Sequence, residues 1–130
     1  RPRTDLPFDA IVTMYAWAQP ADWQIQEFRN GVPDAAISHI DLGRLKQAVE
    51  FGFNRWMAGD RVLVRCQAGL NRSGLVTALI LMSTGLDAET AIKEIRKNRA
   101  QIALFNEEYV AWLKTEGADF LSISPSQRAA

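Results

Sequence analysis

The stretch Val62-Leu-Val-Arg-Cys-Gln-Ala-Gly-Leu-Asn-Arg-Ser-Gly74 predicts a strand, a tight loop and the start of a helix. Its apolar opening, Val62 to Val64, favours a short strand buried on both faces. Gly69 suits a tight loop, and the chain after Gly74 stays apolar almost all round to Met82, which is typical of a helix in the middle of a domain. Such a loop gathers backbone N–H groups and the positive end of a helix dipole around one point. The stretch therefore predicts an anion-binding loop.

The segments on either side complete an α/β pattern. Phe8 to Tyr15 reads as a buried strand, Trp23 to Phe28 as an edge strand, and the apolar stripe from Leu42 to Trp56 as an amphipathic helix capped by Ser38 or Asp41. Further helices are expected from Asp87 to about Asn98 and from near Asn106. We therefore predict a central, mostly parallel sheet of about four to five strands flanked by helices, with the anion-binding loop between the central strand and a helix.

Length and terminal composition predict one domain with a short tail. Residues 1–121 are expected to form the single domain, and the small, polar residues 122–130 a flexible C-terminal tail. The first residue is Arg1 rather than Met, which is compatible with an N-terminal part that has been trimmed.

The charge balance and the cysteine content exclude several classes of function. Fifteen basic residues balance fifteen acidic ones, so no overall field favours nucleic acid, and no segment is long and apolar enough for a membrane. A single cysteine excludes an internal disulfide and a cluster of thiolate ligands. The mechanism expected below requires no metal and no cofactor. We expect a cytoplasmic protein.

The chemistry concentrates on Cys66, Arg72 and Ser73. Cys66 stands at the strand end, where the loop amides and the helix start favour ionisation of the thiol. Arg72 offers a planar fork to two phosphate oxygens, and Ser73 a hydroxyl to the sulfur. The loop residues between them are expected to surround the phosphate: Gln67, Ala68, Gly69, Leu70 and Asn71. Together these groups suit nucleophilic attack on phosphorus.

From Arg65 to Ser73 the sequence resembles the cysteine-based protein phosphatases, and within them the dual-specificity group. The signature of that family is His-Cys-x5-Arg-Ser/Thr, and the resemblance extends from about Phe8 to Leu121. It implies that Asp34, in a loop ahead of the Leu42–Trp56 helix, is the general acid. One position departs from the family, because Arg65 stands where the family usually has a histidine that orients the loop.

The resemblance implies a phosphate monoester hydrolase with a phosphocysteine intermediate. The expected substrates are phosphoproteins carrying phosphotyrosine, phosphoserine or phosphothreonine. Two alternatives remain: an RNA 5′-triphosphatase of the same fold, whose loop the Gly69–Gly74 segment also resembles, and a phosphate-binding module without turnover. His39, the only histidine, would suit a Cys–His enzyme, but Arg72 has no role in such a mechanism, so we expect His39 near the rim of the site. Asp41 is a rival acid that fits better as a helix cap.

Overall fold

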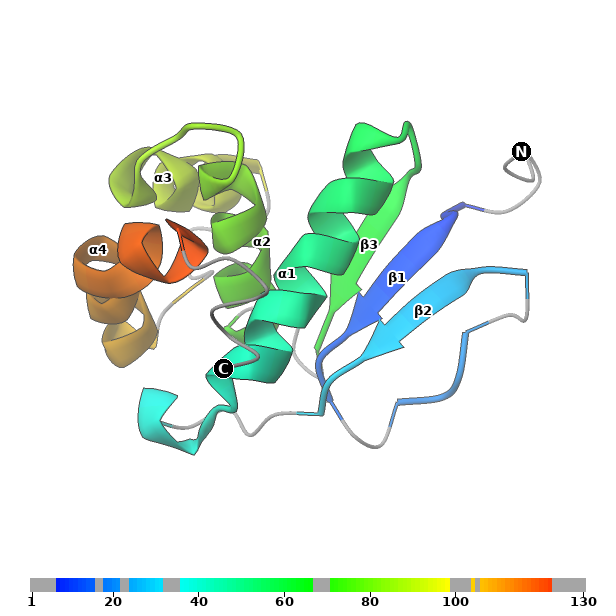
Figure 1. Ribbon diagram of the computed structural model, residues 1–130, viewed down its shortest axis with the longest axis horizontal. Helices are drawn as coiled ribbons and strands as arrows, with labels where there is room; N and C mark the ends of the chain where they lie inside the picture. The colour runs from blue at the N-terminus through cyan, green and yellow to red at the C-terminus, as the bar shows by residue number, and fades with distance from the viewer. Residues whose placement is uncertain are drawn as a thin grey trace.

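Three parallel strands form the sheet, in the order β2-β1-β3: β1 (Ala10–Thr13), β2 (Gln26–Arg29) and β3 (Val62–Arg65) (Figure 1). In this computed structural model the described residues are 7–15, 18–21, 24–31, 36–66, 71–98, 104 and 106–122. Thr13 aligns with Arg29 on one side and with Arg65 on the other. The carboxyl ends of all three strands therefore lie at the same edge of the sheet, next to Cys66.

The predicted helices follow in the expected order: α1 (Leu42–Met57), α2 (Arg72–Met82), α3 (Ala88–Asn98) and α4 (Glu107–Ser122). A short 3₁₀ helix that was not predicted, η1 (Ile37–His39), precedes α1. Two predicted caps are confirmed. The Asp41 carboxylate accepts a hydrogen bond from Arg44 N at 3.1 Å, and that of Asp87 from Thr90 N at 2.7 Å. We expected the buried apolar stripe of α1 to include Trp56, but the Trp56 side chain is 41% exposed.

The core lies between the sheet and the helices, all on one side of the sheet in Figure 1. Val12, Phe28 and Val64 occupy equivalent positions in the register and share one face. On that face the Phe28 ring packs against the Phe51 ring of α1, with 5.8 Å between centroids. Because side chains alternate along a strand, Thr13, Glu27 and Arg65 project from the opposite face.

The α/β class, the parallel sheet and the flanking helices are confirmed. Within the described ranges the sheet has three strands rather than four or five, and β3 forms its edge rather than its centre. The side chains of β3 are half-buried rather than fully buried. A run of three apolar residues indicates that both faces of a strand are shielded from water. It does not indicate whether the strand has a neighbour in the sheet on one side or on both.

The C-terminal end of the described chain is helical. Ser122, expected to open the tail, is the last residue of α4, and residues 123–130 lie outside the described part. No helix in the described ranges is long and apolar enough to cross a membrane. The division into a domain and a tail stays a prediction.

Candidate active site

Cys66 follows the last residue of β3 and lies at the start of α2. It is 7% exposed, and its Sγ accepts a hydrogen bond from the backbone N–H of Ser73 at 3.3 Å. Ser73 is the second residue of α2, where backbone N–H groups have no partner within the helix. The sulfur therefore faces the positive end of the helix dipole, an arrangement that stabilises a thiolate.

Asn71 and Arg72 are buried at the start of α2, directly before Ser73. Arg72, the first residue of the helix, is 9% exposed and Asn71 is 3% exposed. Asn71 Oδ1 accepts a hydrogen bond from the backbone N–H of Asn106 at 2.9 Å. Asn106 in turn caps α4, because its Oδ1 accepts hydrogen bonds from Glu108 N at 3.1 Å and Tyr109 N at 3.2 Å. The amino end of α2 is thereby joined to the first turn of α4.

Gly74 allows a close approach between α2 and Leu104. Leu104 is fully buried, and a Cβ at position 74 would lie 2.8 Å from its Cγ. The backbone of Leu104 has a positive φ of 59°, and its carbonyl accepts a hydrogen bond from Arg96 Nη2 at 2.9 Å. The glycine after Ser73 is therefore required by packing rather than by a turn.

Of the residues predicted for the site, Cys66, Asn71, Arg72 and Ser73 are among the described residues, and the backbone N–H of Ser73 contacts the sulfur of Cys66. The predicted acid Asp34 and the loop residues Gln67, Ala68, Gly69 and Leu70 lie outside the described residues. His39 is exposed in η1, and Asp41 serves as the cap of α1.

Sequence reasoning missed the hydrogen bond by which Asn106 joins α4 to Asn71 at the start of α2. The only local signal is that Asn106 precedes Glu107 and Glu108, a pattern that predicts a helix start. Nothing in that pattern points to a contact with Asn71.

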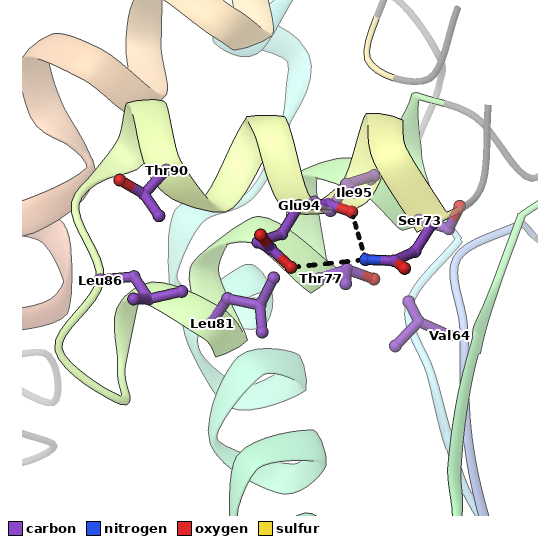
Figure 2. A pocket seen from close by; sticks show the side chains of 10 residues that line it. Val64, Ser73, Thr77, Leu81, Leu86, Thr90, Glu94 and Ile95 are labelled. Carbon is purple, nitrogen blue, oxygen red and sulfur yellow. Dashed lines mark hydrogen bonds between the residues drawn. The ribbon is translucent and has the colours of Figure 1, made fainter. Parts of the chain in front are cut away.

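A cavity of about 500 Å³ lies between β3, α2 and α3 (Figure 2). Val64, Ser73 and Glu94 are among the residues that line it, and Cys66 is not. Figure 2 shows Glu94 accepting hydrogen bonds from Asn98 Nδ2 through its backbone oxygen at 2.8 Å and through Oε1 at 3.4 Å. Because Glu94 places a carboxylate there, this cavity is a poor phosphate site.

Residues 18–117 match the family described as "Dual specificity phosphatase, catalytic domain". This segment contains Cys66, Arg72 and the other predicted site residues. No match was found among curated protein sequences.

Solved phosphatase structures share the fold. The chain is 26% identical to Tk-PTP in its active form, with a TM-score of 0.71, covering 85% of this chain and 79% of that one. Human DUSP28 is 22% identical, with a TM-score of 0.76 and coverage of 89% and 81%. The human tyrosine phosphatase-like serine/threonine/tyrosine-interacting protein is 20% identical, with a TM-score of 0.72 and coverage of 87% and 78%.

Proposed function

The chain belongs to the dual specificity phosphatase family, and we propose that it hydrolyses phosphate monoesters on phosphotyrosine, phosphoserine and phosphothreonine of proteins through a phosphocysteine intermediate. The observation that carries this proposal is the hydrogen bond from Ser73 N to Cys66 Sγ at 3.3 Å, at the amino end of a helix that begins with Arg72. We expect the enzyme to act in the cytoplasm, where a single thiol stays reduced.

In the first step the Cys66 thiolate attacks phosphorus in line with the leaving oxygen. The S–P bond forms as the P–O bond to the seryl, threonyl or tyrosyl oxygen breaks. Arg72 and the backbone amides from Gln67 to Arg72 stabilise the charge on the equatorial oxygens. Asp34, protonated, gives its proton to the departing oxygen.

In the second step water attacks the phosphocysteine. The ionised Asp34 accepts the proton of the water as the P–O bond forms, and the S–P bond breaks to return the Cys66 thiolate and free phosphate. The Ser73 hydroxyl donates to the sulfur as it leaves. Neither step uses a metal ion or a cofactor.

The first experiment compares the wild type with Cys66→Ser on a small aryl phosphate, without metal, over a range of pH. Turnover that the variant loses is the expected result. If the wild type releases no phosphate at any pH while inorganic phosphate still binds, the protein is a binding module.

The binding-module alternative is kept because one structural neighbour is named "tyrosine phosphatase-like" and an interacting protein, rather than a phosphatase.

The substrate class is tested by offering phosphopeptides and a 5′-triphosphate-ended RNA at equal concentration. The loop residues Gln67 to Asn71 include no lysine for additional phosphates, and the net charge is zero, so phosphopeptides are expected to react faster. Faster release of phosphate from the RNA would reassign the protein as an RNA 5′-triphosphatase.

The role of Asp34 is tested by the leaving group. Asp34→Asn should slow alkyl phosphates more than aryl phosphates, because an alkoxide needs the proton and a good phenoxide leaving group needs it less. An equal loss of kcat on both substrates would contradict the assignment of Asp34 as the acid.

A further inference from the structure

Arg65, the residue before the nucleophile, turns away from the sulfur. Its side chain projects from the sheet face opposite the helices, while Cys66 lies in the core beside α2. On that opposite face the guanidinium donates to Thr13 Oγ1 at 2.9 Å, to the carbonyl oxygen of Gln19 at 2.7 Å and to Glu27 Oε2 at 3.0 Å. A planar fork can meet three acceptors in fixed directions, so this side chain is held in one orientation.

Glu27 is the centre of the cluster that receives Arg65. Its Oε2 accepts hydrogen bonds from Arg65, from Thr13 Oγ1 and from Arg29 Nη1, and its Oε1 accepts one from the backbone N–H of Ala21. Burial by itself raises the pKa of this carboxyl, but these hydrogen bonds and the charge of Arg29 outweigh it, so the pKa of Glu27 lies below its usual range. The carboxylate therefore stays charged at neutral pH and keeps its hold on both arginines.

The cluster joins all three strands at the edge where the loop begins. Thr13 ends β1, Arg29 ends β2 and Arg65 ends β3, and the three are aligned in the register. The backbone of Arg65 is fixed as well, since its carbonyl accepts a hydrogen bond from Met14 N at 2.8 Å. Any rotation of β3 at this end would move Cys66, which follows it directly.

We propose that Arg65 is a positioning residue, which Glu27 and Thr13 hold so that the end of β3 fixes the place of Cys66 at the mouth of the phosphate loop. The proposal rests on the proposed function and deepens it, because it assigns a role to the residue that departs from the family signature. The competing explanation is electrostatic, with the charge of Arg65 stabilising the thiolate directly. The orientation and the ion pair with Glu27 both count against it, because a paired charge on the far face of the sheet acts weakly on the sulfur.

Two substitutions at one position separate these explanations. Arg65→Lys keeps the charge but loses the fork, and Arg65→Gln loses both. Arg61→Gln is the matched control, because Arg61 flanks the amino end of the same strand and pairs with Asp9 at 3.0 Å, at the edge away from Cys66. The readouts are kcat and KM for a small aryl phosphate, and the rate at which iodoacetamide alkylates the protein as pH varies. Alkylation reports on Cys66 alone, because it is the only cysteine.

If Arg65 acts by positioning Cys66, Arg65→Lys and Arg65→Gln have the same effect on kcat/KM and on alkylation. Both should lower kcat/KM by about 10- to 100-fold, the range expected when a reacting atom is displaced by about an ångström, and both should change the pH profile of alkylation equally. Arg61→Gln should stay within about twofold of the wild type. The proposal is overturned if Arg65→Lys retains wild-type kcat/KM while Arg65→Gln loses it and shifts the alkylation profile to higher pH. It is also overturned if neither variant differs from the Arg61→Gln control.

A role limited to stability is excluded by assaying each variant well below its melting temperature. A lower melting temperature with unchanged kcat/KM would overturn the proposal. Glu27→Gln provides a second route if Arg65 variants fold poorly, since the amide is nearly the same size but is neutral and keeps only one acceptor oxygen. Glu27→Gln should lower kcat/KM by itself, and add little to the loss in an Arg65→Gln background, because residues of one network are not additive. Fully additive losses would show that the two residues act separately.

A failure of the proposed function gives a different pattern. If the wild type hydrolyses no phosphate ester, the function is wrong, but positioning is still measured by the protection that inorganic phosphate gives Cys66 against alkylation. Loss of that protection in both Arg65 variants, and not in Arg61→Gln, would support the role of Arg65 in a binding protein. Equal protection in all proteins would refute it.

Discussion

Asn71→Ala should weaken the link between the amino end of α2 and α4. Asn71 is 3% exposed, and its Oδ1 accepts the hydrogen bond from Asn106 N at 2.9 Å. The substitution removes one hydrogen bond and leaves a part-buried N–H without this acceptor, which together cost about 2 kcal/mol. For a domain of this size that loss lowers the melting temperature by about 6–10 °C. Arg72 and Ser73 follow directly in the chain, so kcat/KM should fall as well.

Calorimetry and aryl phosphate kinetics measure the two effects on the same samples. Asn98→Ala is the matched control, because Asn98 is exposed and donates only to Glu94, one turn away in its own helix. Its effect should stay within about 0.5 kcal/mol. Asn71→Asp separates the parts of the argument: it keeps an acceptor for Asn106 N and should recover stability, but its negative charge opposes phosphate and should keep KM high. A melting temperature of Asn71→Ala equal to that of Asn98→Ala would refute the anchoring role.

Three further substitutions test the surroundings of the site. Gly74→Ala should cost about 1–3 kcal/mol of stability in a denaturant titration, since the new Cβ would lie 2.8 Å from Leu104 Cγ; an unchanged midpoint would contradict this packing. Lys46→Met should cost about 2–4 kcal/mol, because buried Lys46 Nζ donates to the carbonyl oxygens of Phe120 at 3.1 Å and Leu121 at 2.8 Å; a thermal melt matching wild type would show that α4 ends without this cap. Glu27→Gln should be less stable than wild type near neutral pH, and the difference should vanish as pH falls through the lowered pKa of Glu27, because a depressed carboxyl pKa stabilises only the ionised form. A difference that persists in acid would assign it to packing.

Local sequence was enough for the parts of the fold set by local geometry. The caps Asp41 and Asp87 and the buried helix α2 were all predicted, because cap and helix patterns involve residues a few positions apart. The prediction that Cys66 lies beside the start of α2 agrees with the geometry for the same reason. The contact between Cys66 and Ser73 spans only seven positions.

The contacts that fix the site in place are not local, and sequence patterns did not reveal them. Asn71 and Asn106 are 35 positions apart, and Glu27 and Arg65 are 38 apart. Arg65 and Glu27 meet only because β1 places β2 and β3 on its two sides in register. The chain order of charged residues does not contain this information, since a shift of one residue in either register would move the side chain to the other face.

The same reasoning explains why the replacement of histidine by Arg65 could not be interpreted from the signature alone. A comparison of signatures identifies only the residue before Cys66. Arginine and histidine can then be compared by their charge, but not by the contacts that each side chain makes. The structure shows that the orientation of Arg65 depends on β1 and β2. Thr13 of β1 and Glu27 of β2 supply acceptors that hold the guanidinium on the face of the sheet opposite the helices. An arginine at this position in a chain without an acidic residue at the place of Glu27 would have its charge unpaired there. We therefore predict that transferring only Arg65 into a histidine-containing relative lowers its kcat/KM, and that adding the equivalents of Thr13 and Glu27 restores part of the loss. Equal activity with and without the two added residues would show that the cluster is not what makes Arg65 compatible with catalysis.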